Sequence, residues 1–176
     1  MGNTPKRNFK TVIFCSHIST HNIRNRNIIY YIYYANTHIT YLTSLIVANN
    51  KILRILLNKL IYTPLELLYK LYNTLPMPHL HNMCIANIVH TFYFKNNEMP
   101  LVYRNYFGAN RLIHSYVTRQ AADLHKTVVN TNFGNRSIKN KAPRIWNALP
   151  ATIKNIVSKY KCLKQVKAHF WTQGCL

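Results

Sequence analysis

RLIHSYVTRQAADLHKTVVNTNFGNRSIKNKAPRIWNALP, residues 111–150, is the stretch around which the rest of the chain is organised. Lysines and arginines recur along it, and Asp123 is its one acidic residue. Aromatic and apolar residues lie between these cations, namely Tyr116, Phe133, Ile138 and Trp146. Such a pattern favours nucleic-acid binding, because cations neutralise phosphates and exposed rings stack on unpaired bases. The same residues are also compatible with a small domain that has a solvated basic face and Trp146 as its core anchor.

The candidate nucleic-acid-binding residues are the cations of this stretch and of the segment after it. They are Arg111, Arg119, Arg136, Lys139, Lys141, Arg144, Lys154, Lys161 and Lys164. We expect Lys139, Lys141 and Arg144 to contribute most, because they are predicted to surround a turn that leaves them exposed. Arg119 has two interpretations: it holds a phosphate, or it pairs with Asp123 four residues later in a helix.

Three pieces of this region occur in order and at tight spacing. They are His114-Ser-Tyr116-Val-Thr118-Arg119, Thr131-x-x-Gly134-x-x-Ser137-Ile138 and Ala142-Pro143-Arg-Ile-Trp146-Asn147-Ala-Leu149-Pro150. The arrangement resembles the carboxy-terminal region of reverse transcriptases from jockey-like, LINE-type non-LTR retrotransposons, over roughly residues 33–172. The residues that carry the resemblance are His114, Tyr116, Thr118, Gly134, Pro143, Trp146, Asn147 and Pro150. One departure is Ala142, where the family usually has glycine.

The resemblance implies part of an RNA-directed DNA polymerase that lies downstream of the catalytic palm. Nucleotide transfer by two metal ions needs clustered carboxylates, whereas the chain has only Glu66, Glu98 and Asp123 and lacks the family's Tyr-x-Asp-Asp-type motif. We therefore expect no polymerase activity from the chain alone, no cofactor and no catalytic residue. The implied contribution is non-sequence-specific binding of RNA or DNA, beside the rest of a reverse transcriptase. The alternative is a stand-alone basic structural protein of ribonucleoprotein type.

The charge balance points to a polyanionic partner. The chain has 176 residues, with 23 lysines and arginines against 3 acids and a net charge of +20. Its hydrophobic fraction of 48% excludes a disordered tail. A membrane-spanning helix needs about 20 mostly apolar residues, and no run of that length is present. These properties predict an intracellular protein, in the nucleus or in a cytoplasmic ribonucleoprotein, with RNA or DNA as partner and no membrane.

Cysteines and histidines give weak signals. Cys15, Cys84, Cys162 and Cys175 form no Cys-x-x-Cys pair, and we expect reduced thiols. His79-x-His81-x-x-Cys84 offers three metal ligands in six residues, but structural zinc requires four. We expect histidines on a helix surface and no metal site.

The predicted fold is mainly α, a small helical domain in three parts. Residues 1–38 are expected to form a basic, poorly ordered or degenerate arm, residues 39–107 a helical segment, and residues 108–176 the basic signature region. Apolar spacing predicts a long helix from Tyr41 to about Tyr62. Thr63-Pro64-Leu65-Glu66 predicts a capping box, and a further helix is expected between Pro78 and Asn96.

The signature region is predicted to mix helices with one β element. Residues 127–141 combine β-branched residues with Asn and Gly134, which predicts a short β-hairpin or ribbon. One helical turn is expected from Pro143 to Asn147, and another short helix is expected to open at Pro150. Ser158 is expected to cap a final basic helix.

Overall fold

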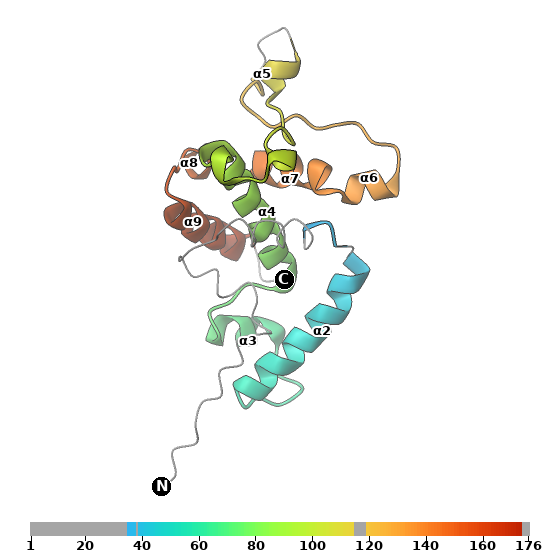
Figure 1. Ribbon diagram of the computed structural model, residues 1–176. Helices are drawn as coiled ribbons and strands as arrows, with labels where there is room; N and C mark the ends of the chain where they lie inside the picture. Colours follow the sequence, from blue (N-terminus) through green and yellow to red (C-terminus); the bar gives the residue numbers. More distant parts are fainter. Residues whose placement is uncertain (1–34, 38, 115–118, 174–176) are drawn as a thin grey trace.

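Helices make up the regular structure of the chain. The computed structural model describes residues 35–37, 39–114 and 119–173, and within these ranges it contains no β-strand (Figure 1). The helices are α2 (Ile39–Leu56), α3 (Leu65–Leu71), α4 (Met77–Phe94), α5 (Asn110–Ile113), α6 (Asn132–Arg136), α7 (Ile138–Ala148), α8 (Ala151–Lys154) and α9 (Lys159–Thr172). Two 3-10 turns, η1 (Asn96–Glu98) and η2 (Leu101–Tyr103), follow α4. The prediction of a mainly α protein is confirmed.

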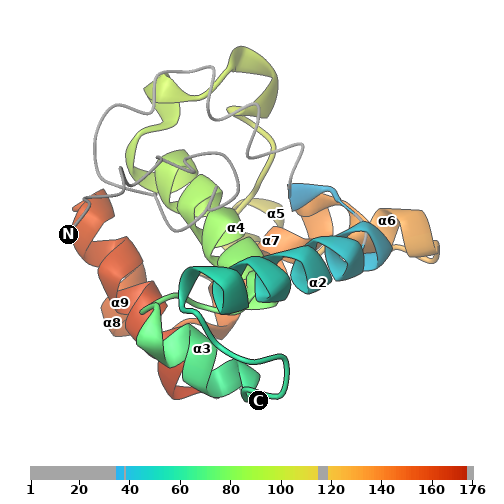
Figure 2. The ribbon, with the colours of Figure 1, turned by 90° about the horizontal axis from the view of Figure 1, so that it is seen from below.

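Helix α4 is the centre of the molecule. Every residue from Met83 to Thr91 is buried, so this helix is covered on all sides. Helices α7 and α9 pack against it, and α4 lies between them in both ribbon views (Figures 1 and 2). The largest fully buried side chains include Ile85 and Val89 of α4, Ile138 of α7 and Val166 of α9. One continuous apolar core therefore joins the helical segment to the signature region.

Helices α2 and α3 form a smaller packed pair beside the core. Leu53 of α2 and Leu68 of α3 are buried, and the Tyr69 hydroxyl donates a hydrogen bond to Asn50 Oδ1. Helix α2 ends at Leu56, earlier than the predicted Tyr62. The reason is local, because Asn58 adopts a left-handed backbone with φ of 49°. Asparagine tolerates this conformation and commonly ends helices.

The predicted capping box at Thr63 does not form. Pro64, not Thr63, is the residue that precedes the first turn of α3, and no side chain caps this helix. The backbone angles of Pro64, φ of −55° and ψ of 139°, are non-helical. Thr63 therefore stands one residue too far from the helix, and Glu66 lies in the first turn, where a negative charge is favourable.

The β-hairpin predicted near 127–141 is replaced by helices. Residues 127–130 are irregular, and the chain then enters α6 and α7. Thr131 Oγ1 accepts the N–H of Gly134 at 3.1 Å, and Ser137 Oγ accepts the N–H of Lys139 at 3.3 Å. Both contacts satisfy helix N-termini, which explains why these side chains favour helix over a ladder.

The helix that contains the Pro-Arg-Ile-Trp piece is longer than the single predicted turn. Ile138, Ala142 and Trp146 recur every four residues along α7, and all three are buried. Pro143 lies inside α7, where it removes one backbone donor but keeps a buried side chain. The predicted short helix after Pro150 is present as α8, with Pro150 preceding its first turn. Ser158 precedes α9, although its side chain makes no capping hydrogen bond.

The last residues of the predicted N-terminal arm contact α7. Ala35 belongs to the core, and Asn36 Oδ1 accepts the N–H of Ile138 at 2.8 Å. The rest of that arm lies outside the described residues, as do Tyr116 and Thr118. A search of the described helices finds none with the length and apolar character needed to cross a membrane.

Candidate nucleic-acid interface

Trp146 anchors the signature region to the central helix. The side chain is 3% exposed, and its ring lies on the ring of Tyr93 of α4, with centroids 5.7 Å apart and planes at 24°. Aromatic pairs of this kind contribute beyond the area that they bury. Trp146 is therefore part of the core and is not accessible to a nucleic acid.

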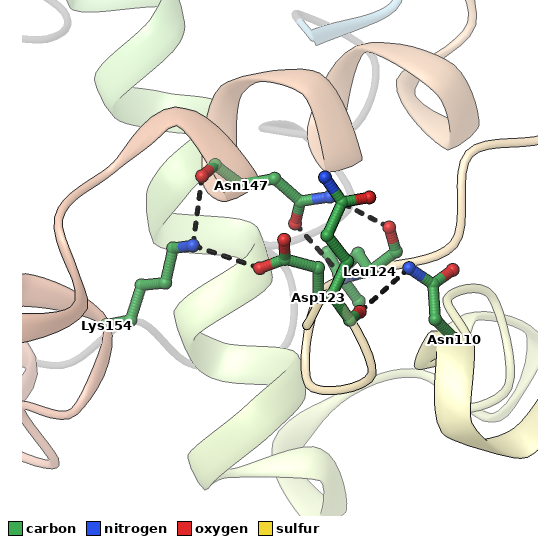
Figure 3. Close-up of polar contacts among 6 residues, drawn as sticks. Asn110, Asp123, Leu124, Asn147 and Lys154 are labelled. Atoms are coloured by element: carbon green, nitrogen blue, oxygen red, sulfur yellow. Dashed lines mark hydrogen bonds and ion pairs between the residues drawn. The ribbon is translucent and has the colours of Figure 1, made fainter. Parts of the chain in front are cut away.

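Asn147, the next residue along α7, holds the main chain of Leu124. Its Nδ2 donates to the Leu124 carbonyl at 2.9 Å, and its Oδ1 accepts the Leu124 N–H at 3.0 Å (Figure 3). Leu124 is itself buried and forms an isolated antiparallel β-bridge with Ala109. The side chain of Asn147 thus satisfies both polar groups of a buried peptide segment, which would otherwise be costly.

Lys154 is committed to the same cluster. Its Nζ donates to Asp123 Oδ1 at 3.1 Å and to the carbonyl of Asn147 at 3.0 Å (Figure 3). The side chains of Lys154 and Asp123 are 20% and 27% exposed. The Lys154 ammonium is therefore held by partners within the fold.

Of the two interpretations of Arg119, the pairing with Asp123 is not observed. Asp123 pairs with Lys154, and residues 119–123 form turns and a bend, not a helix. Arg119 is exposed. Asn110 Nδ2, in α5, donates to the carbonyl of Gln120 at 2.9 Å and fixes the start of the segment 119–123.

Lys141 also points into the fold. Its Nζ donates to the carbonyls of Ala35 and Thr37, at 3.0 and 3.2 Å. Burial lowers the pKa of Lys141, and the nearby charge of Arg136 adds to this effect. The expectation that Lys139, Lys141 and Arg144 surround an exposed turn is thus wrong in two respects: all three lie on a helix, and Lys141 is tied to the residues before α2.

The other candidate cations are exposed. They are Arg111, Arg119, Arg136, Lys139, Arg144, Lys161 and Lys164. Arg136 and Lys139 lie three residues apart at the junction of α6 and α7, whereas Arg144 lies on a different side of α7, because five residues turn a helix by about 140°. Lys161 and Lys164 share one face of α9. We call Arg136, Lys139 and Arg144 the α6–α7 cations.

The remaining signature residues shape the backbone around these cations. A Cβ atom on Gly134 would lie 2.0 Å from Val129 Cγ1, so only glycine lets α6 pack against the preceding segment. Asn140 Nδ2 donates to the Gly134 carbonyl at 2.8 Å. His114 ends α5 and is exposed, with its ring 5.5 Å from that of His125.

Phe133 lies at the surface of the signature region. The sequence placed this residue among the aromatic and apolar residues between the cations without deciding its exposure, and its side chain is 85% exposed. The pattern Thr131-x-x-Gly134 is the sequence signal for this position. Thr131 caps α6, so Phe133 lies in the first turn of this helix, and no residue of α6 is buried.

Of the two histidines near Cys84, His79 is half-buried, whereas His81 is not the surface residue that was expected. His81 is buried, and burial together with the charge of Lys141 lowers its pKa to about 4. The ring of His79 stacks on that of Phe170 at 5.6 Å, and Cys84 is fully buried. No group of three His, Cys, Asp or Glu side chains that could hold a metal gathers in the described ranges.

A scan against models of protein families finds no match to this chain, and searches of curated proteins and of solved structures find none.

Proposed function

We propose that the chain binds RNA or DNA without sequence specificity, as the region downstream of the palm in a LINE-type reverse transcriptase. The observation that carries the proposal is the set of eight exposed cations among the described residues of 108–173, which include Lys126 and the α6–α7 cations. Two of the chain's three acids already pair with lysines of the same chain, Asp123 with partly buried Lys154 and Glu98 with exposed Lys95. The positive potential of these cations is therefore poorly compensated, which favours a phosphate backbone as partner.

The mechanism is neutralisation of phosphates with release of counterions. Each contacted phosphate steepens the dependence of log affinity on log salt concentration by about 0.7 for single strands and about 0.9 for duplex. Flexible side chains on short helices supply charge without a defined arrangement toward base edges, and this supports little sequence preference. The carboxyl groups that polymerisation needs would come from another part of the polypeptide.

The decisive experiment compares two triple variants with equal loss of charge. The first is Arg136→Gln, Lys139→Gln and Arg144→Gln; the matched control is Lys51→Gln, Lys59→Gln and Lys70→Gln, which removes exposed cations from α2, α3 and their connection. Binding to labelled RNA is measured by fluorescence anisotropy across a salt series. We expect the first variant to flatten the slope by about 2–3, and the control by less than about 1.

Equal slopes for the wild type and the first variant would remove these residues from the interface. An equal effect of both variants would reduce the interaction to net charge alone. The reverse-transcriptase part of the proposal has a separate test, which is whether the genomic reading frame continues upstream into an Asp-Asp palm motif. Its absence there would favour a stand-alone ribonucleoprotein component.

A further inference from the structure

Phe133 exposes a large apolar ring beside the α6–α7 cations. Of the aromatic residues in the signature stretch, Trp146 is buried and Tyr116 lies outside the described residues, whereas Phe133 is 85% exposed. Exposed phenylalanine gains nothing from the core, because its ring remains in water. The exposure of Phe133 therefore favours a role in binding over a role in packing.

The backbone on both sides of this ring is held in place. Thr131 Oγ1 accepts the Gly134 N–H, and Asn140 Nδ2 donates to the Gly134 carbonyl. The close approach of Gly134 to Val129 leaves no room for a Cβ atom, so the preceding segment supports the turn from behind. A ring on a fixed turn loses little conformational freedom when it binds, which favours affinity.

Exposed cations follow Phe133 closely in the chain, near where the phosphates on either side of a stacked base would lie. Arg136 follows Phe133 by three residues and is exposed, and residues at this spacing have Cβ atoms about 5–6 Å apart on a helical turn. Lys139 follows after a further three residues and is also exposed. A base on the Phe133 ring would thus leave its neighbouring phosphates within reach of these two side chains.

We propose that Phe133 is a base-stacking residue, and that the chain therefore prefers single-stranded to double-stranded nucleic acid. The inference rests on the proposed function and specifies its ligand. In a duplex the faces of the bases are covered by their neighbours, whereas an unpaired base offers its face to an aromatic ring. Stacking accepts any base, which agrees with binding that lacks sequence preference.

The test uses the full chain and three labelled oligonucleotides: single-stranded RNA, single-stranded DNA of the same sequence, and the corresponding duplex. Phe133→Ala should weaken single-strand binding by about 5- to 100-fold and leave duplex binding unchanged. The salt slope should not change, because the ring carries no charge. The two single-stranded arms show whether the sugar contributes in addition to the base.

Two further variants serve as controls for this comparison. Phe133→Trp retains a ring and should bind single strands at least as well as the wild type. Tyr62→Ala removes another exposed ring, in the connection between α2 and α3, and should have no effect. A 2-aminopurine base in the oligonucleotide gives a second readout, since stacking on Phe133 should quench its fluorescence and Phe133→Ala should abolish the quenching.

The outcomes separate this inference from the proposed function. If the wild type binds single strands with a steep salt slope and Phe133→Ala binds equally well, the stacking role is refuted and phosphate binding stands. An equal loss on single strands and duplex would also refute it. If the wild type binds none of the three oligonucleotides, both proposals fall. A stronger effect of Tyr160→Ala, the exposed ring beside Lys161 on α9, would move the contact to that helix.

Discussion

Asn147 and Leu124 are joined by a pair of hydrogen bonds. The side-chain amide of Asn147 accepts the backbone N–H of Leu124 and donates to its backbone carbonyl. The two residues are 23 positions apart, and the contact fixes the segment before Lys126 against α7. Lys154 and Asp123 complete the cluster, so the Trp-Asn piece of the signature holds the region together from its centre.

Replacement of Asn147 should destabilise the protein. Asn147→Ala leaves the N–H and the carbonyl of buried Leu124 without partners, and we expect a loss of about 2–4 kcal/mol in the free energy of unfolding. Urea unfolding followed by circular dichroism measures it. Asn155→Ala is the matched control, because Asn155 is exposed, and it should change stability by less than about 0.5 kcal/mol. Equal effects of the two substitutions would contradict the role of Asn147 in holding the main chain of Leu124.

Trp146→Ala should cost about 3–5 kcal/mol, because it removes a buried ring that lies on Tyr93. Thermal unfolding provides the measurement, and Trp146→Phe should lose less because it retains an aromatic contact. A Trp146→Ala protein with wild-type stability but weak RNA binding would contradict the core position of Trp146 and the stacking role proposed for Phe133.

Lys139 and Lys141 should behave differently although they are two residues apart. Lys141→Met removes the donor to the carbonyls of Ala35 and Thr37, and we expect a loss of about 1–3 kcal/mol in stability with little change in the salt slope of RNA binding. Lys139→Gln should leave stability within about 0.5 kcal/mol and flatten the slope. The opposite assignment of effects would show that Lys141 faces the ligand.

Gly134 and Val129 should be coupled. Gly134→Ala brings a methyl group against Val129 and should destabilise the protein by about 1–3 kcal/mol. Val129→Ala removes the opposing atoms, so the double variant should recover part of that loss. A double-mutant cycle in urea tests this, and strict additivity of the two substitutions would show that they do not touch.

Stability should fall as the pH is lowered from about 7 to about 4. The folded protein holds the pKa of His81 at about 4, against 6.5 in the unfolded chain, through burial and the charge of Lys141. Below pH 6.5 the unfolded state therefore binds a proton that the folded state does not bind until about pH 4. This difference is worth about 3 kcal/mol, lost progressively over that interval.

His81→Gln should reduce the pH dependence without removing it, because burial also lowers the pKa of His90. Melting temperatures at a series of pH values give the comparison. A profile for His81→Gln that parallels the wild type would mean that His81 has the same pKa in the folded and unfolded states.

Sequence patterns were most reliable where the determining interactions are local. The proline before α8 and the apolar spacing of α4 act within a few residues, and both predicted helices are present. At Thr63 a local pattern failed, because Pro64 takes the position that the capping side chain needs. At 127–141 the hydroxyls of Thr131 and Ser137 compete with strand formation, and the composition of the segment did not reveal this.

The sequence by itself determined the helical class, the excess of positive charge and the order of the signature residues, because these depend on composition and on spacing along one chain. Which lysine stays exposed and which is a structural donor was decided only by tertiary structure. Lys139 and Lys141 have the same chemistry and nearly the same position in the sequence. The carbonyls of Ala35 and Thr37, more than 100 residues away, separate them, since a cation that satisfies buried carbonyls is no longer available to a phosphate.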